Sequence, residues 1–161
     1  METKITKVET YIVRDKLSQS FYFSQWKDSE RCMCLVKITD SNGQYGWGEG
    51  YGPASVLEAG IKLLKPLLIG ENPLHNEVIW NKMHRKTLDY ARKGVLIASI
   101  SAIDIAITDL KGKNLGLSVA NLLGGSLRKK VQPYATGMYF TEKDNPAKDF
   151  EEEAKRYLEK G

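Results

Sequence analysis

The stretch that decides the fold is VLIASISAIDIAITDLKGK, residues 95–113, which has the longest helical pattern in the chain. Ala98, Ala102 and Ala106 recur at every fourth position, so they lie in one row along a helix. Isoleucine and leucine side chains beside the row supply bulk. Because a row of small side chains lets a neighbour approach closely, the pattern predicts a long helix packed tightly against another element.

Strand patterns precede this helix. They cover residues 5–13, which alternate in part between apolar and polar side chains, residues 32–39, and residues 44–49. The DSNG segment, residues 40–43, supplies an Asn-Gly pair that tolerates the positive φ values of a tight hairpin. Residues 16–30 are expected to be a polar and aromatic loop. The pattern therefore predicts a three-stranded antiparallel meander.

Further helices are predicted on both sides of the long one. One begins after Pro53 and is broken at Pro66. Another covers residues 77–90, and a short last helix covers residues 117–123 before two glycines. The predicted fold class for residues 1–126 is therefore α+β, a three-stranded antiparallel meander followed by a helical bundle.

Residues 127–161 are predicted to be a linker and one β/α unit. VQPYATGMYF, residues 131–140, has the composition of a strand, and a helix follows from about 145 to 158, with a solvated glutamate run at 151–153. A crossover helix needs a second parallel strand to return to. We therefore expect the first unit of a truncated TIM-type barrel, whose strand is either disordered or docked on a polypeptide that supplies the missing barrel.

The composition is that of an ordinary globular protein, with 42% hydrophobic and 27% charged residues and a net charge of +4. The basic residues are scattered apart from Arg128-Lys129-Lys130, which we interpret as a solvated linker, so no nucleic-acid partner is expected. The first ten residues have no continuous apolar core, and no run approaches the roughly 18 apolar residues of a membrane helix. We therefore expect no signal peptide and no membrane partner.

The two cysteines are expected to be buried structural thiols. Cys32 and Cys34 are separated by one residue, so on a strand they point to the same face in poor geometry for a disulfide. His75 and His84 lie far along the chain without a metal-binding spacing. Free thiols are consistent with a cytoplasmic location.

No complete catalytic constellation is visible in the sequence. The glycines of residues 46–52, GWGEGYG, lack the spacing of a phosphate-binding loop. They either permit tight turns at a strand end or form a mobile loop that carries Glu49 and Tyr51 over a cavity. Asp104 and Asp109 are five positions apart on one helix and do not share a face. We expect a structural hydrogen bond for Asp104 and solvation at the helix end for Asp109.

The segment SQSFYFSQWK, residues 18–27, places four aromatic side chains between polar residues. Aromatic side chains gathered at a surface are costly to leave in water. Either they pack back onto the domain or they form a lid over a ligand. The residues alone leave both alternatives open.

Several segments, in their order and spacing, resemble the enolase superfamily, specifically its mandelate racemase and muconate-lactonizing enzyme branch. They are YGWGE at 45–49, SAIDIAITDLKGK at 101–113, GLSV at 116–119, LLGG at 122–125 and YATG at 134–137. Thr108 is a departure, because many relatives carry tryptophan there, and it affects packing rather than membership.

The resemblance implies an α+β capping domain, residues 1–126, on a modified TIM barrel. Members abstract a proton next to a carboxylate, and a Mg²⁺ ion stabilises the enediolate. The lysine acid/base lies on the second barrel strand and the acidic metal ligands on the third to fifth. We therefore expect no catalytic residue and no metal ligand in this chain, and no activity from it alone.

The resemblance also implies that two segments of the cap, residues 18–27 and 49–53, reach over the barrel mouth and set specificity. The side chains expected to enclose a substrate are Tyr22, Trp26, Lys27, Tyr51 and Tyr139. Lys27 is the candidate partner of an acidic substrate, and Met138 could line the same cavity as Tyr139.

The expected parent activity is that of a Mg²⁺-dependent acid-sugar dehydratase. A racemase, epimerase or cycloisomerase of the same branch is the alternative within the family. An alternative from another class is a non-catalytic binding or oligomerisation module. The expected partners are a small carboxylate substrate and further copies of the chain in a homo-oligomer.

Overall fold

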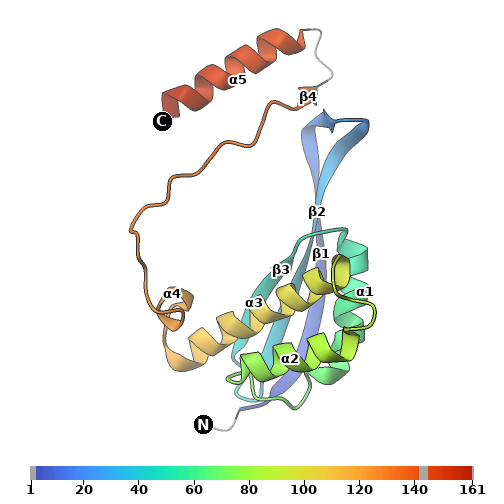
Figure 1. Ribbon diagram of the computed structural model, residues 1–161, viewed down its shortest axis with the longest axis vertical. Helices are drawn as coiled ribbons and strands as arrows, with labels where there is room; N and C mark the ends of the chain where they lie inside the picture. Colours follow the sequence, from blue (N-terminus) through green and yellow to red (C-terminus); the bar gives the residue numbers. More distant parts are fainter. Residues whose placement is uncertain (1–2, 142–144, 161) are drawn as a thin grey trace. The chain divides into compact units, whose positions relative to one another are not determined.

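The computed structural model describes residues 3–141 and 145–160 (Figure 1). Two compact units are present. One consists of the residues up to Val13 together with Cys32–Ser126, and the other of Arg14–Arg31 together with the residues from Leu127 onward. As a boundary between independently folding domains, the division between residues 126 and 127 stays a prediction.

Three strands form the sheet of the first unit, and two of them continue into the second. They are β1 (Ile5–Phe23), β2 (Trp26–Asp40) and β3 (Tyr45–Gly50), in the order β3-β2-β1. β2 and β3 pair antiparallel, with Ile38 opposite Gly46. The predicted α+β class and its antiparallel meander are therefore confirmed.

The turn between β2 and β3 is built around one buried carboxylate. The Oδ1 atom of Asp40 accepts hydrogen bonds from the backbone N–H groups of Asn42 at 2.9 Å and Gln44 at 3.0 Å. Gly43 has a φ of 79°, which glycine adopts without strain. Asn114 donates to the Oδ2 atom of Asp40 at 2.8 Å, so the same side chain ties the hairpin to a helix.

The helices of the first unit occur where the sequence predicts them. They are α1 (Ala54–Leu64), the short 3₁₀ helix η1 (Lys65–Leu67), α2 (Asn76–Thr87), α3 (Val95–Leu115) and α4 (Val119–Leu122). α1, α2 and α3 lie on one side of the sheet (Figure 1). Pro66 sits in η1, where α1 gives way to the tighter helix. The core between the layers includes Val36, Ile38, Leu57, Ile61, Ile103 and Ile107.

Two glycines allow β3 to lie directly against α3. A β-carbon at Gly48 would collide with the carbonyl oxygen of Ala102, and one at Gly46 would collide with the carbonyl oxygen of Ala106. Ala102 and Ala106 are fully buried. The predicted close approach to the alanine row is therefore observed. These two glycines lie inside a strand and serve this contact, so the expectation of tight turns is wrong for them.

The predicted loop over residues 16–30 is wrong, because this segment is a β-ribbon. β1 and β2 continue through it and are joined by a two-residue turn, in which Ser24 has a φ of 53°. The aromatic residues at 21–23 favour strands, and Arg14 and Glu30 form an ion pair of 2.9 Å across the ribbon. Polar residues in the segment lie on strands whose pairing supplies the order that a loop would lack.

The predicted strand over residues 131–140 is also largely wrong. Only β4 (Phe140–Thr141) is a strand, and it pairs antiparallel with β1 of the same chain, with Phe140 opposite Tyr22. Pro133 lacks an N–H group for a strand ladder. Phe140 and Thr141 are therefore ordered by pairing within the chain, and docking of this segment on a second polypeptide stays a prediction. The predicted helix is confirmed as α5 (Pro146–Lys160).

Asp109 connects α3 to β3. Its Oδ2 atom accepts hydrogen bonds from the backbone N–H of Trp47 and from the Nζ atom of Lys113, each at 2.8 Å. Lys113 also donates to the carbonyl oxygen of Tyr45 at 3.0 Å. The expectation that Asp109 is merely solvated at a helix end is therefore wrong.

We expect Gly48→Ala to destabilise the first unit by about 3 kcal/mol, because the new methyl group meets backbone atoms that cannot turn aside. Gly43→Ala is the control: no atom lies within 4 Å of its β-carbon, so only the left-handed backbone costs about 1 kcal/mol. Urea unfolding of both variants measures the difference. Equal losses would contradict the close contact between β3 and α3.

We expect Asp109→Ala to lower the free energy of unfolding by about 1–2 kcal/mol, because the N–H of Trp47 loses its acceptor. Asp109→Asn keeps an acceptor oxygen and loses only the exposed ion pair with Lys113, so about half of that loss or less is expected. Thermal and urea unfolding compare the two variants. If both variants lost the same free energy of unfolding, the stabilisation would come from the charge of Asp109 and not from its hydrogen bond to Trp47.

Candidate functional site

The ribbon formed by the end of β1 and the beginning of β2 carries three of the residues predicted to enclose a substrate. The Nζ atom of Lys27 lies 5.4 Å from the centre of the Tyr22 ring, so the structure brings these two together in a cation–π contact. Trp26 follows the turn and is 63% exposed. Packing back onto the domain and closure over a ligand both stay predictions for this segment.

Tyr139 lies next to the ribbon within the same unit. The centre of its ring is 4.7 Å from that of Phe21, in a tilted arrangement. The guanidinium carbon of Arg31 lies 4.8 Å from the centre of the same Phe21 ring. Sequence reasoning did not select Phe21 or Arg31. Strand alternation is the signal that would have separated Phe21 from Tyr22 by placing them on opposite faces.

Tyr51 belongs to the first unit, directly after β3, and is 96% exposed. Its position matches the second of the two segments expected to form a lid. Strand β3 ends at Gly50, directly before Tyr51, and Gly52, directly after it, has a φ of 138°. The roles of all five residues in substrate enclosure stay predictions.

Glu153 fixes the backbone next to Tyr139. Its Oε2 atom accepts a hydrogen bond of 3.2 Å from the N–H of Met138, a residue with a φ of 59°. Its Oε1 atom accepts a bond of 2.5 Å from the Tyr157 hydroxyl, which raises the pKa of Tyr157. The expectation of a solvated glutamate run is therefore wrong for Glu153, whereas Glu151 pairs with exposed Lys155.

The remaining carboxylate and thiol candidates do not assemble into a reactive centre. Burial, and to a lesser extent Glu77, raise the pKa of Asp104. Asp104 forms no hydrogen bond with any residue that the structure describes, so the expected structural bond is not found. Cys34 is buried as predicted, which raises the pKa of its thiol. Cys32 is only half-buried, so the expected burial is wrong for it, and both cysteines are free.

Among residues 3–141 and 145–160, no group of three or more His, Cys, Asp or Glu side chains could hold a metal ion. The side chains described therefore do not fit a Mg²⁺ site. No helix in the same part of the chain is long and apolar enough to span a membrane.

Comparison with known sequences identifies the family of most of the chain. A family model described as the mandelate racemase / muconate lactonizing enzyme N-terminal domain matches residues 7–124. The D-galactarolactone cycloisomerase of Agrobacterium fabrum is 37% identical over 136 residues, 84% of this chain and 36% of that protein. The arabinonate dehydratase of Saccharolobus solfataricus is 41% identical over 122 residues, 74% of this chain and 32% of that protein.

Solved structures agree with this comparison. The 3,6-anhydro-D-galactonate cycloisomerase from Zobellia galactanivorans superposes with a TM-score of 0.74 at 49% identity, over 83% of this chain and 35% of that one. The L-talarate dehydratase from Polaromonas, complexed with Mg and L-glucarate, has a TM-score of 0.69 at 27% identity, over 76% of this chain and 35% of that one.

The chain spans about a third of the length of these relatives. The relatives are dehydratases and cycloisomerases, so the matched family contains lyases and isomerases. The chain therefore belongs to the mandelate racemase/muconate lactonizing enzyme branch of the enolase superfamily, and it contains the N-terminal domain of that family.

Proposed function

We propose that residues 1–126 form the substrate-capping part of an enzyme that abstracts the proton next to the carboxylate of a sugar-derived acid, and that the reaction is a cycloisomerisation. The observation that carries the proposal is the 49% identity, over 83% of the chain, to the 3,6-anhydro-D-galactonate cycloisomerase. Sequence analysis alone ranked dehydration first. The higher identity over a longer part of the chain changes that order.

Dehydration of a sugar acid is the second candidate. It is favoured by the 41% identity to the arabinonate dehydratase over 122 residues. Both reactions begin with the same proton abstraction according to the family resemblance, so the cap would bind similar substrates in either case.

The geometry of the ribbon supports a cap for an acidic, partly apolar ligand. Trp26 in the ribbon presents exposed aromatic surface, which can cover the apolar face of a ligand without losing contacts within the fold. Tyr51, in the first unit, is also exposed, and its part in the cap is proposed from the family resemblance. Lys27 carries a positive charge next to Tyr22 in the ribbon, which favours a carboxylate. We assign Trp26, Tyr51, Tyr22 and Tyr139 to enclosure and Lys27 to attraction of the carboxylate.

A Mg²⁺ ion is proposed for the complete enzyme, because the Polaromonas talarate dehydratase structure contains Mg with L-glucarate. When bound, the ion supplies electrostatic stabilisation of the negative charge that develops on the substrate. The described residues offer no cluster for it. The contribution proposed for this chain is therefore to bind and enclose the substrate.

We expect a chimera that joins residues 1–126 to the barrel of the Zobellia cycloisomerase to keep kcat/KM for 3,6-anhydro-D-galactonate within roughly tenfold of the parent enzyme. A chimera with the barrel of the arabinonate dehydratase is expected to lose more on arabinonate. Circular dichroism confirms that both chimeras fold. The reverse ranking would make dehydration the function, and two folded but inactive chimeras would contradict the capping role.

We expect Trp26→Ala and Tyr51→Ala in the active chimera to raise KM roughly tenfold or more, because each removes contact area from the enclosed substrate. Both side chains are exposed, so their fold stability is expected to change by less than about 0.5 kcal/mol. Tyr90→Ala, at a side chain 64% exposed outside the proposed lid, is the matched control. A large fall in Tm with unchanged kinetics would show that Trp26 and Tyr51 are packing residues.

A further inference from the structure

The edge of β1 that faces away from β2 forms backbone hydrogen bonds near both of its ends. Between them, no partner strand pairs with it among the described residues. At its beginning, the N–H of Ile5 donates to the carbonyl oxygen of Glu71 at 2.8 Å, and the N–H of Gly70 donates to the carbonyl of Ile5 at 2.9 Å. The other partner on this edge, within the part of the chain that the structure describes, is β4, whose pairs are confined to Phe21 and Tyr22.

The open stretch of the edge within the first unit is Val8–Val13. A strand edge presents a row of unpaired N–H and C=O groups, to which another extended chain can add. Proteins often block such an edge with proline, and this stretch contains none. The stretch is therefore competent for strand addition, in which main-chain hydrogen bonds supply affinity and neighbouring pockets supply specificity.

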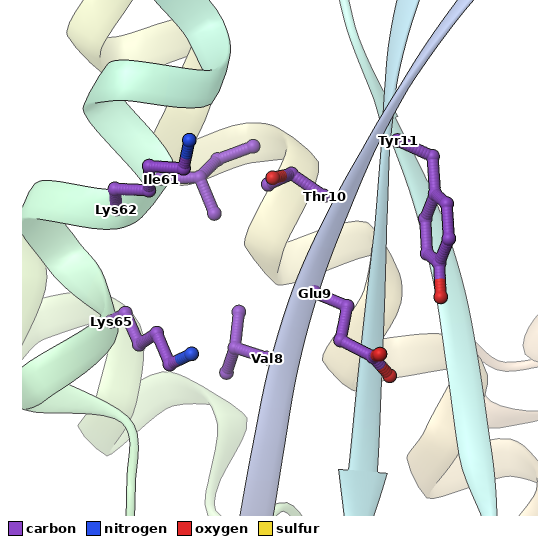
Figure 2. A pocket seen from close by; sticks show the side chains of 7 residues that line it. All are labelled: Val8, Glu9, Thr10, Tyr11, Ile61, Lys62 and Lys65. Carbon is purple, nitrogen blue, oxygen red and sulfur yellow. The ribbon is translucent and has the colours of Figure 1, made fainter.

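A groove of about 300 Å³ lies next to this open edge, between β1 and α1. Figure 2 shows that Val8 and Thr10 project from β1 toward α1, whereas Glu9 and Tyr11 project to the other side of the strand. Val8 and Ile61 are almost fully buried and form an apolar floor. A strand added to β1 would place every second side chain in this groove.

The groove has an uncompensated positive charge. Lys62 pairs with Glu58 at 3.1 Å, and Thr10 also donates to Glu58 at 2.9 Å, so that carboxylate is already neutralised and its pKa is lowered. Glu9, the acidic residue among those that line the groove, pairs with Lys7 at 2.7 Å. Lys65 has no polar side-chain partner among the described residues, and its amino group points toward Val8 (Figure 2). The groove therefore combines an apolar floor with a lysine that favours an acidic group.

We propose that the open edge of β1 and this groove bind an extended acidic peptide by strand addition. The peptide backbone pairs with Val8–Val13, an apolar side chain covers Val8 and Ile61, and an acidic side chain pairs with Lys65. A second copy of the chain fits less well. Two-fold antiparallel pairing of β1 keeps both α1 helices on one face of the joint sheet, so the two Lys65-bearing sides would approach and repel each other.

The test uses the 161-residue chain and a blocked octapeptide, Thr-Val-Thr-Glu-Thr-Val-Thr-Glu, which presents valine and glutamate on one face. We expect it to bind and to slow amide hydrogen exchange at alternate residues of Val8–Val13. The same peptide with lysine in place of glutamate is expected to bind at least roughly tenfold more weakly. Equal binding of the two peptides, or no binding, would overturn the proposal.

Variants of the protein test the charge of the groove. Lys65→Glu is expected to weaken binding of the glutamate peptide roughly fivefold or more and to improve binding of the lysine peptide. Lys86→Glu, at an exposed lysine of α2, is the matched control and is expected to change neither affinity. Urea unfolding verifies that both variants fold. Equal effects of the two substitutions would show that only net charge matters, against the proposal.

Backbone methylation of the peptide tests strand pairing directly. N-methyl groups on one alternate set of residues remove the N–H groups that face β1, whereas those on the other set face outward. We expect one methylated isomer to lose binding and the other to bind like the parent. Equal affinity of both isomers would overturn strand addition. Concentration-dependent protection of Val8–Val13 without peptide would identify a second copy as the occupant and overturn the acidic peptide.

Discussion

The rest of the first unit depends on the contact between β3 and α3 at the level of the backbone. At Gly46 and Gly48 there is no room for a β-carbon, because carbonyl oxygens of Ala106 and Ala102 occupy its place. Strands and helices normally keep a full side-chain layer between them. Removing that layer at two positions fixes the distance and the rotation of α3 over the sheet, because any slip would bring larger side chains into the gap.

This contact also explains why the polar groups around it have structural rather than chemical roles. With α3 fixed on β3, Asp109 reaches the N–H of Trp47, and Asn114 reaches the carboxylate of Asp40 in the β2–β3 turn. Each carboxylate is used to satisfy backbone or amide donors. Of the two carboxylates on α3 that were weighed as catalytic candidates, Asp109 therefore has a structural role, whereas Asp104 takes no part in these hydrogen bonds.

The parts of the fold that sequence predicts correctly are those set by local periodicity. The helix over residues 95–113 and the Asn-Gly turn are determined by residues close together in the sequence, and both are found. The ribbon over residues 16–30 was missed because its stability lies in pairing between strands, including the Arg14–Glu30 ion pair.

The strand predicted over residues 131–140 and one contact near the candidate site show what local patterns do not reveal. Residues 131–140 have a strand-like composition, but most of that stretch has no partner strand in the part of the chain that the structure describes, and only β4 pairs. At the candidate site, adjacency in sequence brings Lys27 and Tyr22 together across a short turn. The contact of Phe21 with Tyr139 joins residues far apart in the chain, which periodicity does not reveal.

The replacement of a loop by a ribbon changes the physical argument for capping. A flexible loop would lose conformational entropy when it closed over a ligand, at about 1–2 kcal/mol for each residue that became fixed. In the ribbon, the backbone on both sides of the turn is already fixed by strand pairing, so less of that entropy remains to be lost. Trp26, directly after the turn, is 63% exposed, so its side chain is available for contact with a ligand. Under the proposed function, selectivity would therefore depend on the side chains presented by the ribbon rather than on its closure.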